Sequence, residues 1–220
     1  GSQDQNLSEC SLGEEIDSKM NEEAPKEWAG WKSTYKKSVM VESISGFFEK
    51  ETGHVHPPPD WKIPPNIESH LSFIANGPLY YDPLGEFSER RKEFGSFPED
   101  ELYDRYNSCC WRMWHYGHYN FVRRVAHRDD PIATVTCLGM FLDAAMRLCL
   151  YLNNEFAPYW KWVPHRFRQI EWAGEFIRHV DAIPNAGSPA EQAEHVNEIY
   201  RLADEKLKER GTSMKEQARI

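Results

Sequence analysis

The stretch richest in residue types suited to ligand binding is residues 111–124, WRMWHYGHYNFVRR. In a helix, three- and four-residue spacing places Tyr119 and Arg123 on one strip with Asn120 beside them. Aromatic rings stack on flat ligands, an amide pairs with a base edge, and a guanidinium binds phosphate. The stretch therefore fits one wall of a nucleotide pocket, although residue types alone favour an amphipathic helix at the rim of a core.

A second candidate binding feature is Lys161, which stands between Trp160 and Trp162 in the sequence. Two flanking indole rings can hold the aliphatic stem of the lysine and limit its rotamers. An ammonium positioned in this way is a suitable partner for a polyphosphate. The alternative is an exposed lysine supported only by cation–π contacts. Lys161 and Trp162 join Tyr119, Asn120 and Arg123 as the predicted nucleotide- or substrate-binding residues.

Two histidine pairs could ligate a metal ion. His54 and His56 lie in a proline-rich loop, and His115 and His118 are three residues apart in the expected helix. Neither pair has a carboxylate or thiolate at ligand spacing on the same face, although a cysteine could approach through the fold. Contacts with aromatic rings are the preferred interpretation, so no metal ligand is predicted.

Signatures of known catalytic sites are absent from the 220 residues. The chain contains no P-loop, no dinucleotide-binding glycine motif, no nucleophile elbow, no HExxH and no paired CxxC. No residue is therefore predicted to be catalytic.

The charge balance limits the possible partners. Against 35 acidic residues the chain has 26 Lys and Arg, a net charge of −9, and 13% of its residues are aromatic. Nucleic-acid scaffolds and anionic membrane surfaces require a basic field, so neither partner is expected. The aromatic content is that of a folded chain rather than a disordered one.

The cysteines and the longest apolar stretch indicate a cytoplasmic protein. Five cysteines without regular spacing are typical of reduced thiols, and no signal peptide is expected at the N-terminus. Residues 132–152 approach the length of a membrane span. Asp143 and Arg147 in the middle of that stretch favour the core helix of a bundle instead.

Apolar periodicity and capping residues predict the elements. A short strand is expected at 38–41, followed by short helices at 43–51, 64–76 and 84–94. Four long helices are expected to follow, beginning at a capping box at Ser96–Glu99, near Asp130, after Pro164 and at a second capping box at Ser188–Glu191.

These elements predict a mainly α protein, an antiparallel bundle of about four long helices preceded by a small α+β remnant. The expected organisation has five parts: a disordered tag or leader at 1–11, the tail of an upstream domain at 12–53, a connecting loop with short helices at 54–95, the bundle at 96–211 and a C-terminal tail at 212–220.

A series of short motifs resembles one family of helical domains. The motifs are Asn76-Gly77, the segment DPLGEFS at 82–88, Pro98-Glu99-Asp100, Gly117-His118-Tyr119-Asn120 with Arg123, and Leu152-Asn153 through Pro158-Tyr159-Trp160-Lys161-Trp162. Their order is similar to that of domain of unknown function 4037, over roughly residues 24–182. Histidines stand at positions 115 and 118, where the family has glutamines.

The resemblance implies a function as well as a fold. The family domain normally follows a DNA-polymerase-β-like nucleotidyltransferase domain, whose paired carboxylates hold Mg²⁺ against ATP or GTP. This sequence lacks those carboxylates, and Glu42 alone could correspond only to a third one. The expected function is the nucleotide- or substrate-side domain of such a protein, non-catalytic on its own and without a cofactor. The alternative is a non-catalytic binding or oligomerisation module of the same fold. The expected partners are a nucleotide or small-molecule acceptor and the upstream domain.

Overall fold

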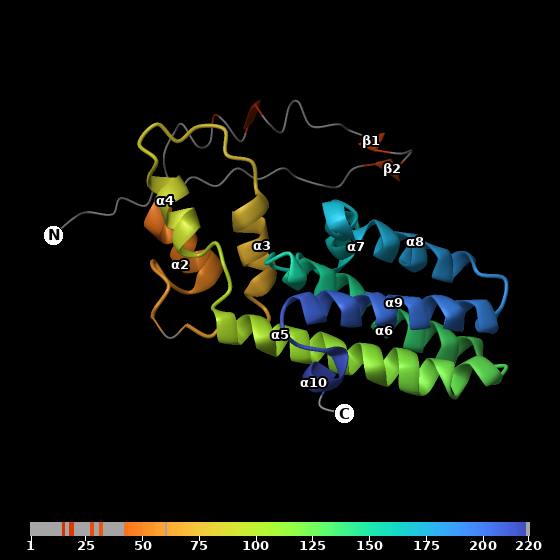
Figure 1. Cartoon of the computed structure of the whole chain (residues 1–220). Helices are drawn as coiled ribbons and strands as arrows, with labels where there is room; N and C mark the ends of the chain where they lie inside the picture. The colour runs from red at the N-terminus through yellow and green to blue at the C-terminus, as the bar shows by residue number, and fades with distance from the viewer. Residues whose placement is uncertain are drawn as a thin grey trace.

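The computed structural model describes residues 42–59 and 61–218, and in the N-terminal part residues 15, 18–19, 27–28 and 31–32. The protein is mainly α-helical, as predicted (Figure 1). Strands β1 (Glu27–Trp28) and β2 (Trp31–Lys32) form an antiparallel pair in which Trp28 is opposite Trp31. The strand predicted at 38–41 lies outside the described residues.

Three short helices form one end of the molecule: α2 (Ile44–Thr52), α3 (Glu68–Asn76) and α4 (Glu86–Glu93). Ser43 caps α2 by accepting a hydrogen bond from the Gly46 amide, and Gly53 ends it with a φ of 82°. Fully buried Phe48 packs against Phe87 and Phe94, with ring centroids 5.3 Å apart in each pair. Helix α2 thus shares a core with its neighbours across the boundary predicted at residue 53.

Helix α5 (Glu99–Arg112) begins without the predicted capping box. Pro98 precedes its first turn, and no side chain caps it. Three carboxylates, Glu99, Asp100 and Glu101, occupy the first turn, where the helix dipole favours negative charge. The prediction of a Ser96 cap is therefore wrong, although the start of the helix was placed correctly.

Helix α5 runs directly into a ten-residue π-helix, η2 (Met113–Val122). Most π-helical segments are single turns and are frequent at functional sites. The side-chain Nδ2 of Asn120 donates to the His115 carbonyl oxygen five residues earlier, at 2.8 Å. The buried residues Met113, Gly117, Phe121 and Val125 recur every four positions, and they face α6.

Helix α6 (Pro131–Leu152) is the predicted central helix. The Asp130 carboxylate caps it by accepting from the Ala133 amide at 3.0 Å. Asp143 in its middle pairs with Arg112 of α5 at 2.7 Å and with Arg147 at 2.9 Å. Among the described residues it is the one helix long and apolar enough to cross a membrane, and 56% of its most apolar window is buried inside the protein.

The third long helix predicted after Pro164 is broken into pieces. They are α7 (Val163–Phe167), the 3-10 turn η5 (Glu171–Ala173) and α8 (Gly174–Ala182), with further 3-10 turns η4 (Trp160–Trp162) before them and η6 (Ile183–Asn185) after them. Phe167 and Ile170 are buried, but Gly174, which follows them at helical spacing, is exposed. The chain changes direction between residues 167 and 171, so the predicted single helix after Pro164 does not form.

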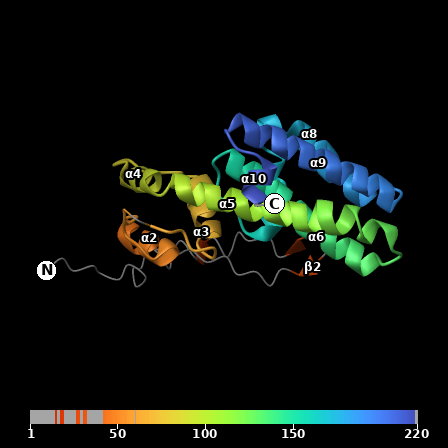
Figure 2. The ribbon, with the colours of Figure 1, turned by 60° about the horizontal axis from the view of Figure 1, so that its bottom comes forward.

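Helix α9 (Pro189–Glu209) confirms the second capping box. The Ser188 hydroxyl accepts from the Glu191 amide at 3.2 Å, and the Glu191 carboxylate accepts from the Gly187 amide at 2.7 Å. Helices α8 and α9 lie side by side over η2 and α6 (Figure 2). The segment predicted as a tail instead folds back as α10 (Met214–Ala218), which packs on α5 and buries Met214. The 3-10 turn η3 (Val125–His127) precedes α6.

Candidate functional site

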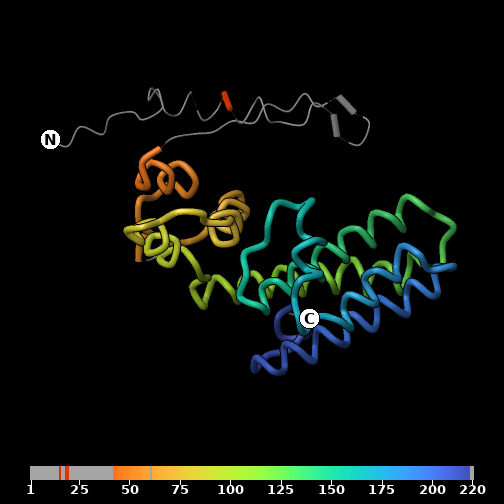
Figure 3. Tube along the Cα trace, turned by 90° about the horizontal axis from the view of Figure 1, so that it is seen from above, coloured from red at the N-terminus to blue at the C-terminus, as the bar shows by residue number. Residues whose placement is uncertain are grey.

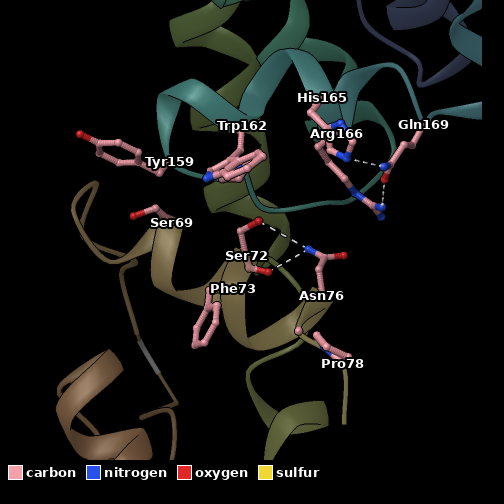
Figure 4. A pocket seen from close by; sticks show the side chains of 12 residues that line it. Ser69, Ser72, Phe73, Asn76, Pro78, Tyr159, Trp162, His165, Arg166 and Gln169 are labelled. Carbon is pink, nitrogen blue, oxygen red and sulfur yellow. Dashed lines mark hydrogen bonds between the residues drawn. The ribbon is translucent and has the colours of Figure 1, made fainter. Parts of the chain in front are cut away.

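A cleft of about 710 Å³ lies between α3 and the chain that follows α6 (Figure 4). One wall comes from α3 and the loop after it, and consists of Ser69, Ser72, Phe73, Asn76, Gly77 and Pro78. The opposite wall comes from η4, α7 and their flanking residues, and consists of Pro158, Tyr159, Trp162, His165, Arg166 and Gln169. The walls are more than 80 residues apart in the sequence, and the antiparallel α5–α6 hairpin brings them together.

A buried carboxylate fixes one wall to the other. Glu68 at the start of α3 is 6% exposed, and its Oε1 accepts from the Ala157 amide at 2.8 Å. Its Oε2 lies 3.1 Å from Nε of Arg105 on α5. The Arg105 guanidinium also donates to the Ile63 carbonyl oxygen at 3.0 Å. Glu68 therefore ties α3, α5 and the segment leading into η4 together at one point.

The polar side chains of the cleft are held by their neighbours. Arg166 donates from Nε to Glu155 at 2.6 Å and from Nη1 to Gln169 Oε1 at 2.7 Å. Nε2 of Gln169 lies 2.9 Å from Nε2 of His165. On the opposite wall the Asn76 amide donates to the Ser72 carbonyl oxygen at 2.9 Å. These contacts fix the side chains before a ligand arrives, which lowers the entropic cost of binding.

The cleft combines aromatic surface with the Arg166 guanidinium, which is paired with Glu155. Phe73, Tyr159 and Trp162 are 61%, 55% and 54% exposed. The described lining residues include Arg166 and His165 but no Asp or Glu, in a chain whose net charge is −9. Rings of this kind stack on flat ligands, and a guanidinium binds phosphate or carboxylate. The arrangement suits a flat aromatic ligand that carries negative charge.

A second cavity, of about 420 Å³, shares Ser69, Pro158 and Tyr159 with the first. Arg147, His70 and Trp160 are among its other lining residues. The two cavities thus adjoin along the Pro158–Tyr159 segment.

Nucleophilic chemistry by cysteine is not supported at this site. None of the described cysteines is among the residues that line the two cavities. Burial raises the pKa of the Cys109 thiol to about 12, and it raises the pKa of Cys149 well above its usual value. Thiols with such pKa values stay protonated near neutral pH.

The structure separates the two predicted binding segments. Trp162 lines the cleft and Lys161 precedes it on η4, with its ammonium 5.7 Å from the Trp162 ring centroid. Arg123 follows the last residue of η2, eight residues before α6, whereas Lys161 follows the end of α6. Neither Arg123 nor Lys161 is among the residues that line the two cavities. Ligand contact at either segment stays a prediction.

The predicted residues on η2 contact one another and their neighbours. The Tyr119 ring stacks on Trp114 with centroids 5.1 Å apart, and the guanidinium carbon of Arg124 lies 4.0 Å from the Tyr119 ring centroid. Nη2 of Arg123 lies 3.1 Å from Nε2 of His118. Together with the internal hydrogen bond of Asn120, these contacts give the strip a structural role at the far end of the bundle.

Three of the four predicted histidines, His54, His115 and His118, contact aromatic rings, whereas His56 contacts a carboxylate. His115 stacks on Trp111 with centroids 4.6 Å apart, and His118 stacks on Tyr200 at 5.4 Å. His54 meets Trp61 edge to face, and His56 Nδ1 lies 2.7 Å from Glu93. In the described part of the chain no three His, Cys, Asp or Glu side chains are grouped to hold a metal ion. That these histidines bind no zinc stays a prediction.

Sequence reasoning missed the α3 wall and the α7 side chains of the cleft. Asn76-Gly77 stood out only as a helix stop and as part of a motif, yet both residues line the cavity. The motif series itself was a usable signal in the sequence, because two of its segments, Asn76-Gly77 and 158–162, contribute lining residues to this one cleft.

Comparison with known families identifies the stretch that builds the cleft. Residues 66–163 match the model of a family described as a domain of unknown function, DUF4037. Residues 66–163 form a DUF4037 domain. No curated protein and no solved structure shows significant similarity to the chain. The matched stretch begins beside α3 and ends at the first residue of α7, so its two ends supply all of one cleft wall and half of the lining residues of the other.

Proposed function

We propose that this chain is the substrate-side helical domain of a nucleotidyltransferase-like protein, and that its cleft between α3 and α7 binds a nucleotide without catalysing transfer. The observation that carries the proposal is the cleft itself, which is aromatic and is lined by Arg166, whose partner Glu155 is not among the described lining residues. Its volume of about 710 Å³ is in the usual range for small-molecule sites. The link to nucleotidyl transfer rests on the DUF4037 resemblance and is an argument by analogy.

The chemistry of the two walls suggests how a nucleotide would lie. The base would stack on the exposed Trp162 ring, which has Tyr159 beside it on the same wall of the cleft (Figure 4). The phosphates would lie toward Arg166 and His165, with the Lys161 ammonium at the rim. Among the described residues no carboxylate forms an ion pair with Lys161, so its charge is available to a ligand.

Binding should depend on Trp162 and not on its neighbour Trp160. Base stacking is worth roughly 1–3 kcal/mol, so Trp162→Ala should weaken ATP or GTP binding by about tenfold or more in calorimetric titration. Trp160→Ala is the matched control, because Trp160 is 64% exposed on the same turn but is not a lining residue of this cleft. Lys161→Ala and added salt should both weaken binding, since the phosphate contacts are exposed. Equal losses in the two tryptophan variants would contradict the proposed site.

The isolated chain should transfer no nucleotide. Nucleotidyl transfer depends on neutralising the triphosphate with metal ions held by paired carboxylates. The described residues contain no such metal-binding group, so we assign no step to Mg²⁺ in this chain. Incubation with labelled ATP or GTP, Mg²⁺ and candidate acceptors should release no pyrophosphate. Metal-dependent release that is lost in Glu42→Gln or Asp82→Asn would show that the catalytic site is present after all.

A further inference from the structure

The N-terminal half of α6 carries an apolar stripe that the described part of the protein leaves uncovered. Ile132, Val135 and Met140 are 79%, 72% and 37% exposed, and Thr136 and Gly139 are exposed between them. Residues 131–142 contain no charged side chain, although 28% of the chain is charged. The solvent face of a helix in a globular protein is normally polar, so a stripe of this kind marks an interaction surface.

The stripe follows one face of the helix and has a defined end. Positions 132, 136, 139 and 143 share that face by helical spacing. It ends at Asp143, which pairs with Arg112 and Arg147, and beyond it Leu148 to Leu150 are fully buried. Figure 3 shows this half of α6 along one edge of the bundle, with α9 on its other side.

We propose that this stripe joins two copies of the chain, with their α6 helices packed antiparallel about a two-fold axis at Gly139. A two-fold dimer uses the same patch on both subunits, so the apolar stripe of one copy covers that of the other. Gly139 suits the crossing point, because a Cβ atom there would meet nothing within 4 Å and no side chain holds the helices apart. The flanking Val135 and Met140 side chains then pack across the axis.

Charges at the two ends of the stripe favour the antiparallel arrangement. Arg128, Asp129 and Asp130 stand before α6 with a net charge of −1, and Arg112 and Arg147, which both pair with Asp143, leave a net charge of +1 near the other end of the exposed face. Asp130 is nine residues before Gly139 and Arg147 eight residues after it. Antiparallel pairing therefore places the negative end of one copy beside the positive end of the second copy. Parallel pairing would bring like charges together, at a cost in affinity.

A lipid surface is a poorer occupant of the same stripe. Asp129, Asp130 and Asp143 border it, and the chain carries a net charge of −9, so an anionic leaflet would repel it. The second half of α6 is buried in its own bundle, which leaves too little exposed length to span a bilayer.

The test is the mass of the full chain in solution. We expect sedimentation and light scattering to show a dimer that dissociates on dilution, and Val135→Glu to be monomeric, since it buries an unpaired charge in the interface. Leu84→Glu is the matched control, because Leu84 is 79% exposed far from α6 in the sequence and should leave the dimer intact. Circular dichroism of each variant verifies that the fold is kept.

A crosslinking experiment tests the position of the axis. Gly139→Cys should form a disulfide-linked dimer on mild oxidation, because the two residues at position 139 face each other, whereas Leu84→Cys should not. A wild-type chain that stays monomeric at hundreds of micromolar would overturn the proposal. So would a dimer that Val135→Glu leaves unchanged. Binding of the wild-type chain to phosphatidylserine vesicles that is lost in Val135→Glu would assign the stripe to a membrane instead.

Discussion

Replacing Glu68 by alanine is expected to lower the free energy of unfolding by about 3–5 kcal/mol, the usual cost of breaking a buried ion pair. The substitution removes the carboxylate that lies 3.1 Å from Arg105 and accepts from the Ala157 amide at 2.8 Å. Arg105 then keeps only Glu101, at 3.9 Å, as a charged partner among the described residues. The side chain of Arg105 is 16% exposed, so water replaces the lost contact poorly.

The measurement is urea unfolding followed by far-ultraviolet circular dichroism. Glu198→Ala is the control, because it breaks an ion pair with Arg201 whose side chains are 44% and 52% exposed. Such exposed pairs contribute about 0–1 kcal/mol. Glu68→Gln keeps an acceptor for the Ala157 amide but not the charge, so its loss should be smaller than that of Glu68→Ala. A Glu68→Ala variant as stable as Glu198→Ala would show that this buried contact is not what holds the cleft walls together.

The same variant connects stability to ligand binding. Without Glu68, the segment from Ala157 to Trp162 loses its hydrogen bond to α3, so the walls of the cleft are no longer fixed at their closest point. Nucleotide affinity should fall with Glu68→Ala even under conditions where the chain remains folded. Because Glu68 is not among the lining residues of the larger cleft, that loss would be one of positioning.

Several helix ends, though not the Ser96 cap predicted for α5, were predictable from the sequence because short-range chemistry determines them. Ser43, Asp130 and Ser188 are capping residues whose partners lie three residues away, and Gly53 and Gly211 supply the positive φ that ends a helix. The break of the expected third helix was not predictable in this way. Its apolar residues keep helical spacing through the turn, and only packing against α6 and α9 shows where the chain changes direction.

The cleft could be predicted only in part, because it depends on contacts between distant segments. Trp162 was found from its local pattern, but the α3 wall becomes visible only when the α5–α6 hairpin returns the chain to it. The local pattern around Tyr119, Asn120 and Arg123 did not show that these residues lie outside the lining of this cleft. That property depends on how η2 and η4, which precede and follow α6, are arranged in the fold.

The spacing of inward-facing residues changes where the π-helix begins. Between residues 102 and 113 the inward positions average fewer than four residues apart, as in an α-helix, whereas Met113, Gly117, Phe121 and Val125 are spaced by four. A longer repeat fits a wider helix, in which each residue turns the chain less. A hydrogen-bond register of five residues is not a property of any single side chain, so propensity alone does not reveal it.

Gly117 on this π-helix is expected to tolerate no side chain. A Cβ atom there would lie 2.3 Å from Cδ2 of Phe141, whose ring is fully buried in α6. Gly117→Ala should lower the free energy of unfolding by about 1–3 kcal/mol, the range for overpacked cores, and Gly117→Val by more. The gain from replacing glycine in a helix is roughly 0.5–1 kcal/mol, so the clash outweighs it.

Two further variants separate this clash from a general effect of glycine replacement. Gly174→Ala, at the exposed start of α8, places its Cβ where nothing lies within 4 Å, and it should leave stability unchanged or slightly higher. Phe141→Leu removes the ring that Gly117→Ala would strike, so the double variant should lose less than the sum of the two single variants. Additive losses in urea unfolding would mean that Phe141 is not the obstacle. In that case the wide turn of η2 itself, rather than the close approach of α6, would account for the glycine at position 117.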